Sequence, residues 1–133
     1  MAYTVNLITL PGFTAETDLS AKQFYAVKCN STAGHVAIVN ATTDIPMGVL
    51  QNKPKAGYEA EIAIIGVAKM IAGTSVGWTA GVRVGVDSTG KAAPVASGTT
   101  RNVLGQYQLI PGQGTVALNQ IISFIMPATV TRY

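Results

Sequence analysis

Short runs rich in β-forming residues recur along this chain, and glycine, proline or a polar turn breaks each of them. Runs of this kind at intervals of about ten residues are typical of an all-β sandwich or barrel. Residues 19–27 and 117–126 could each form a turn or two of helix. Their β-branched residues and the nearby proline and glycine argue against longer helices. The expected strands are YTVNLITL (3–10), FYAVK (24–28), HVAIV (35–39), GVLQ (48–51), YEAEIAIIG (58–66) continued by VAKMIAG (67–73), VRVGVD (82–87), KAAPVA (91–96), VLGQYQLI (103–110) and QIISFIM (120–126).

The run at 58–66 alternates between acidic and apolar residues. Glu59 and Glu61 fall on one face and Ala60 and Ile62 on the other, as in a strand with one buried face. Two carboxylates on one face could form an acid–base pair, but the solvated face of a half-buried strand is the simpler interpretation. Gly66 follows within the apolar sequence and indicates a bulge or a bend.

The chain has 133 residues, the length of one domain. It contains no internal repeat and no interdomain linker. Residues 1–20 differ from the rest, because one β-like run and Pro11-Gly12 precede a polar link. They form either the first strand of the domain or an extended arm that adds a strand to a neighbouring chain. We therefore distinguish this N-terminal segment from a single β domain at 21–133.

Charge is scarce in this chain. Charged residues make up 11% of it and hydrophobic residues 48%, which predicts that part of the surface is buried against a partner. The net charge is +3 and the cations are scattered, so the basic face that direct nucleic-acid binding requires is missing. Cys29 is the single cysteine, and neither a signal peptide nor a transmembrane run is recognisable. We expect a cytoplasmic product without disulfides or membrane contact.

The segment 85–91, GVDSTGK, matches the spacing of a phosphate-binding P-loop. A P-loop continues with Ser or Thr, which binds magnesium, and then with a helix. Here Ala92 follows and the flanks are β-like. A β-hairpin turn with Gly90 at positive φ explains the segment better.

Catalytic and metal-binding chemistry has little support in the sequence. His35 and Cys29 each stand alone, whereas a metal site needs three or four ligands. The nucleophile motif G-x-S-x-G is missing. We expect a protein that is not an enzyme, with no catalytic residue, no cofactor, no metal and no small-molecule substrate.

Four segments occur in a recognisable order: GVLQNKPKAG (48–57), EIAIIGVAKM (61–70), TAGVRVGVDSTGK (79–91) and LGQY (104–107). This order resembles that of the tailed-phage head decoration proteins, also called capsid cement proteins. Each segment is only a turn or strand feature, and it is their order and spacing that carry the resemblance. The resemblance extends over about residues 20–110. The N-terminal segment does not match it residue by residue, and the tail at 108–133 is longer than the pattern requires.

The resemblance implies a small β-barrel or β-tulip-like domain, commonly a homotrimer. Such a protein is made in the host cytoplasm and joins the virion on the outer surface of the head. There it binds major capsid protein subunits of the expanded shell and stabilises the head against the pressure of packaged DNA. Two alternatives stay open: another virion β-domain, associated with the tail or a fibre, and a nucleic-acid-binding β-barrel.

Two segments supply candidate capsid-binding residues. In 48–57, two lysines flank Pro54 without a helix or a hydroxyl beside them, so we expect them to be solvated or to face acidic groups on a capsid subunit. In the N-terminal segment, alternate side chains would give an arm its specificity. The candidates are Tyr3, Val5, Leu7, Ile8, Leu10, Pro11, Lys53 and Lys55.

Overall fold

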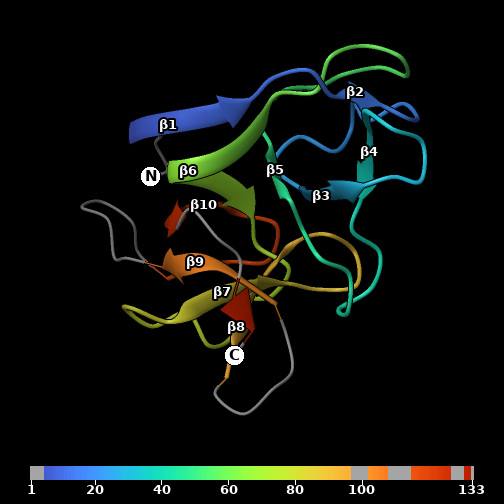
Figure 1. The fold of residues 1–133 in the computed structure, drawn as a ribbon. Coiled ribbons are helices and arrows are strands. Elements are labelled where there is room, and N and C mark those ends of the chain that lie inside the picture. Colours follow the sequence, from blue (N-terminus) through green and yellow to red (C-terminus); the bar gives the residue numbers. More distant parts are fainter. Residues whose placement is uncertain (1–4, 97–101, 108–114, 127–130, 133) are drawn as a thin grey trace.

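Eleven β-strands form one sheet in the computed structural model, which describes residues 5–96, 102–107, 115–126 and 131–132 (Figure 1). The prediction of an all-β fold is confirmed. Among these described residues there is no helix, so 19–27 and 117–126 are not helical. The described residues therefore include no helix long and apolar enough to cross a membrane. The strands are β1 (Val5–Leu10), β2 (Thr14–Ala15), β3 (Ala26–Cys29), β4 (His35–Ile38), β5 (Gly48–Leu50), β6 (Ile62–Ile71), β7 (Arg83–Val86), β8 (Ala92–Val95), β9 (Asn102–Tyr107), β10 (Ile121–Met126) and β11 (Thr131–Arg132).

The strands follow the order β2-β4-β3-β5-β6-β10-β9-β7-β8, with β1 beside β6 and β11 beside β9. Hairpins join β3 to β4 and β7 to β8, as the turn residues predict. In the second hairpin Gly90 has a φ of +87°, and the carboxylate of Asp87 accepts hydrogen bonds from the N–H groups of Thr89 (2.8 Å) and Lys91 (3.0 Å). The segment that resembles a P-loop is therefore a hairpin turn.

β6 is the longest strand and connects two parts of the sheet. Ile62 and Ala63 pair with both β5 and β1, while residues 66–71 pair with β10. Between these halves Gly66 has a φ of +107°, a conformation that side chains with a Cβ rarely adopt. The strand curves strongly there (Figure 1). The bend expected at Gly66 is present, and it directs the two halves of β6 into different parts of the molecule.

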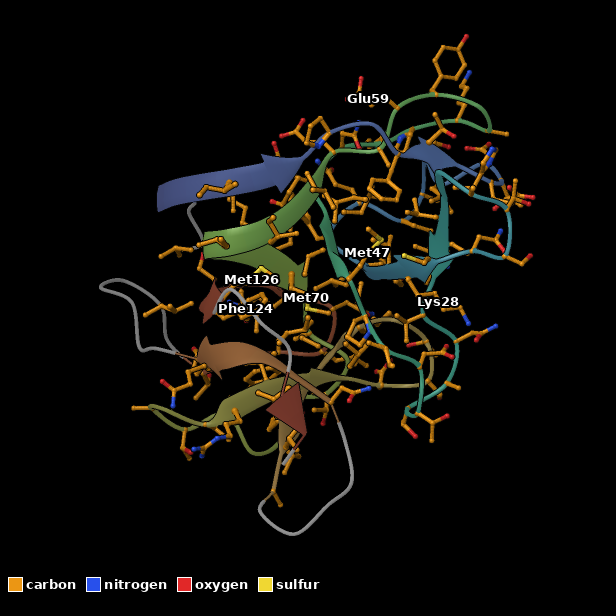
Figure 2. All side chains as sticks on the ribbon, in the orientation of Figure 1. Lys28, Met47, Glu59, Met70, Phe124 and Met126 are labelled. Atoms are coloured by element: carbon orange, nitrogen blue, oxygen red, sulfur yellow. The ribbon has the colours of Figure 1, made fainter. Side chains whose placement is uncertain are left out.

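Each part has its own hydrophobic core. The smaller core lies among β2, β3, β4, β5 and the start of β6, and includes Leu50 and Ile62, both fully buried. The larger core takes most of its residues from β6, β7, β8, β9 and β10. Figure 2 shows Met70, Phe124 and Met126 together within it. Burial of alternate residues on β6 and β10 therefore holds the two strands against one core.

The sheet is open and does not close into a barrel. The end strands are β2 and β8. In the described residues, Thr14 of β2 forms an isolated bridge with Glu59, just before β6, and Ala92 of β8 forms one with Ala72, just after β6. The barrel alternative is wrong, because strand pairing does not continue around a single axis: the first half of β6 pairs with β5 and β1, and its second half pairs with β10.

The N-terminal segment contributes two strands to this sheet. β1 is antiparallel to β6, and β2 is parallel to β4. β2 and β11 escape sequence analysis because each has only two residues, too few for alternation to be recognised. The division into 1–20 and 21–133 stays a prediction.

Tyr107 is fully buried in the larger core, and Trp78 packs its ring edge against it at 5.2 Å between centroids. The phenol oxygen has no hydrogen-bond partner among the described residues. Burial raises the pKa of Tyr107, because the charged form is poorly solvated there. An unpaired buried hydroxyl lowers stability.

We expect Tyr107→Phe to leave stability unchanged or to raise it by up to about 1 kcal/mol in urea unfolding at pH 7. Above pH ~10 the unfolded state loses the tyrosine proton more readily than the folded state, so wild-type stability should fall with pH relative to the variant. A variant clearly less stable than wild type at pH 7 would show that the hydroxyl is satisfied.

Candidate functional site

A two-stranded ribbon brings together the two segments that hold the predicted capsid-binding residues. β1 is antiparallel to the first half of β6. The pairing continues beyond β1, where the N–H of Ala60 donates to the carbonyl of Phe13 at 2.9 Å. Residues 5–15 therefore run beside 57–67 and lead to the 52–59 loop (Figure 1).

One end of this ribbon carries exposed apolar side chains. Ile8 on β1 is 51% exposed and lies opposite Ile65 of β6, while Ile125 on β10 is 47% exposed and lies opposite Val67. Directly opposite residues of antiparallel strands have neighbouring side chains. We call Ile8, Ile65, Val67 and Ile125 the apolar cluster. The two pairs lie on either side of Gly66 in β6, and exposed apolar side chains that gather on a surface can mark protein interaction sites.

The other end is the 52–59 loop, whose ends are tied together by one side chain. Asn52 donates from Nδ2 to the carbonyl of Glu59 at 3.0 Å, and its Oδ1 accepts from the N–H of Glu61 at 3.0 Å. A surface hollow of ≈ 570 Å³ lies along the loop. It is lined by Asn52, Lys53, Pro54, Lys55, Tyr58 and Glu59.

The predicted residues of β1 divide between surface and core. Ile8 and Pro11 are exposed. Leu7 and Leu10 are half-buried, and Leu7 packs against the larger core. Leu7 therefore serves folding, and Ile8 and Pro11 are the residues of this group that a partner can reach.

The remaining predicted residues that the structure describes lie at the two ends of the ribbon. Lys53 and Lys55 are exposed in the 52–59 loop. Val5 pairs with Val67 through β1 and β6. Tyr3 lies outside the described residues. The structure thus places Ile8 on the ribbon and Lys53 in the loop at its end, separated by about 20 Å if each residue advances about 3.3 Å.

Sequence analysis missed other members of this surface. Ile65, Val67 and Ile125 belong to apolar strand segments, and only the strand register shows that Ile65 lies opposite Ile8 and Ile125 opposite Val67. Tyr58 and Glu59 adjoin the lysines in sequence. The aromatic residue after Gly57 is the available signal, but the sequence pattern assigns Tyr58 to a strand at 58–66.

Two acidic side chains elsewhere lie close to basic ones. Lys28 Nζ is 2.8 Å from the carboxylate of Asp44, and His35 Nδ1 is 2.7 Å from that of Glu16. The hydrogen bond from Lys28 is the main cause that lowers the pKa of Asp44. In the described part of the chain, no three His, Cys, Asp or Glu residues gather as metal ligands would. These pairs tie segments of the chain together, and the candidate interaction surface lies on the ribbon.

Comparison with known proteins agrees with this picture of a structural protein. A family model described as phage cement protein matches residues 8–107. The match begins inside β1, earlier than the span of 20–110 that the sequence pattern covers, and ends with β9. The chain matches none of the curated proteins.

A solved structure shares the fold. The crystal structure of head fiber gp8.5 N base in bacteriophage phi29 superposes with a TM-score of 0.61 at 15% sequence identity. The similarity covers 96% of this chain and 99% of that one. At this identity the likeness concerns the fold alone, whereas the family model matches most of the sequence. The chain belongs to the phage cement protein family.

Proposed function

We propose that this protein binds the outer surface of an expanded phage head as a homotrimer and joins neighbouring major capsid protein subunits. In this position it stabilises the head against the pressure of packaged DNA. The observation that carries the proposal is the family match over residues 8–107. Membership of the family gives the chain a structural role in the capsid and makes it a virion component.

The apolar cluster supplies a surface suited to such binding. Ile8 and Ile125 are each about half exposed, on two strands that both pair with β6, and only 11% of the chain is charged. Interface centres are depleted in charge and rich in apolar groups. We propose that this cluster contacts the major capsid protein.

Several weak contacts per particle are enough for stable cementing. When one subunit of a trimer is bound, the others bind from a high effective concentration. A protein that binds the expanded shell but not its disassembled subunits stabilises the shell by mass action. Sedimentation equilibrium of the purified protein should therefore give three times the chain mass.

The test uses expanded heads that lack the protein. Purified protein should add to them at saturable stoichiometry and raise the temperature at which they release DNA or break open. The physical reason is that binding lowers the free energy of the intact shell relative to the disrupted one. Heads that gain no bound protein under these conditions would contradict the proposed function.

A point substitution tests the apolar cluster. Ile8→Asp should weaken binding to expanded heads by about tenfold or more, because a carboxylate would be desolvated in an apolar contact. Val76→Asp is the matched control, since Val76 is 75% exposed and lies outside the ribbon. Wild-type binding by Ile8→Asp, with the fold intact by circular dichroism, would place the contact elsewhere.

A head-fibre base is the second candidate function, favoured by the shared fold with the phi29 head fiber base. Cryo-electron microscopy of the native particle distinguishes the two. A cement protein should contact several capsid subunits and end near the shell, whereas a fibre base should continue into a projecting fibre.

A further inference from the structure

The 52–59 loop is fixed at several points along its length. Pro54 is buried, and its carbonyl accepts a hydrogen bond from the N–H of Leu19 at 2.9 Å. The N–H of Gly57 donates to the carbonyl of Ala15, also at 2.9 Å. A loop held at its tip and at both ends loses little conformational entropy when a partner binds.

This fixed loop presents one aromatic and three charged side chains to solvent. Tyr58 is 67% exposed although it is large and aromatic. Lys53 and Lys55 flank the buried Pro54 and are both exposed, as is Glu59. Figure 2 shows Glu59 near the top of the molecule, where this loop ends. Tyrosine is enriched where proteins bind other proteins, because its ring packs while its hydroxyl stays hydrogen-bonded.

We propose that this hollow binds an acidic segment of the major capsid protein, with a partner carboxylate between Lys53 and Lys55 and partner side chains packed on Tyr58. The inference rests on the proposed function and specifies the chemistry of a second contact. It lies about 20 Å along the ribbon from the apolar cluster, by the strand rise of about 3.3 Å per residue. One chain can therefore hold two separate places on the shell.

Charge complementarity favours a protein partner over nucleic acid. Glu59 lines the same hollow as the two lysines. A continuous polyanion would be repelled there, whereas a protein segment can set a carboxylate against the lysines and a hydrogen-bond donor against Glu59. Nucleic-acid affinity also requires many phosphate contacts, and two lysines supply few.

The test compares single charge reversals on expanded heads. Lys53→Glu and Lys55→Glu should each weaken binding by about tenfold and reduce its dependence on salt concentration, because an attractive charge pair becomes repulsive. Lys22→Glu is the matched control, since Lys22 is also exposed but lies outside the hollow. It should bind as wild type does. Tyr58→Ala should weaken binding without changing the salt dependence.

The outcomes separate this inference from the proposed function. If wild-type protein binds heads and all three lysine variants bind equally well, the hollow is not a contact and the inference is overturned, while the proposed function stands. If wild-type protein does not bind heads, both fail. Tight binding of the wild-type protein to duplex DNA, lost in Lys53→Glu, would overturn the acidic protein partner in favour of nucleic acid.

Discussion

Phe124→Ala should destabilise the protein by about 3–5 kcal/mol, whereas Ile125→Ala should change its stability by about 0.5 kcal/mol or less. Phe124 is 1% exposed and packs in the larger core, so its removal leaves a cavity. Ile125 follows it on β10 but faces the opposite side and is 47% exposed. Chemical denaturation of both variants measures the two effects.

The same pair separates folding from function. Ile125 belongs to the apolar cluster, so Ile125→Ala should fold normally yet bind expanded heads more weakly than wild type. The two substitutions act on neighbouring residues with opposite consequences, because successive strand side chains point to opposite faces. Equal losses of stability in the two variants would contradict the placement of β10.

Gly105→Ala should also destabilise the protein strongly, by about 3 kcal/mol, because the new methyl group would overlap its neighbours. A Cβ at Gly105 would meet the carbonyl oxygen of Ile125 most closely, and it would lie 3.0 Å from the Phe124 ring. The backbone oxygen cannot move away without disturbing the pairing of β9 with β10. Thermal unfolding followed by circular dichroism gives the size of the effect.

Gly81→Ala is the control for this substitution. Gly81 has a φ of +78° and open space where a Cβ would lie, so alanine there brings conformational strain of about 1 kcal/mol without a clash. A Gly105→Ala variant no less stable than Gly81→Ala would show that β9 and β10 are less closely packed than described.

The sequence was sufficient where local chemistry decides the structure. The alternation at 59–62 predicts that Glu59 and Glu61 are exposed and that Ala60 and Ile62 are buried, and this is what the structure shows. Gly90 takes the positive φ expected of a hairpin turn. These features depend on side-chain periodicity and on the backbone freedom of single residues, which neighbouring residues determine.

The sequence was insufficient for the candidate site. Ile8 and Lys53 were predicted from separate segments and for different reasons, and their common position depends on the pairing of 5–15 with 57–67. Register between distant strands is set by the packing of both faces. No local pattern distinguishes Leu7, which packs on the core, from Ile8, which is exposed.

By itself, the sequence therefore determined the all-β class, the turns and the family resemblance, because these follow from residue types at short range. The tertiary structure alone decided that the sheet stays open, that β6 bends between two cores, and that an apolar cluster and a basic hollow share one ribbon. Those properties arise from contacts between residues more than 50 positions apart, such as Val67 with Val5 and Ile125. Such contacts depend on how whole strands pack together, which local residue preferences do not specify.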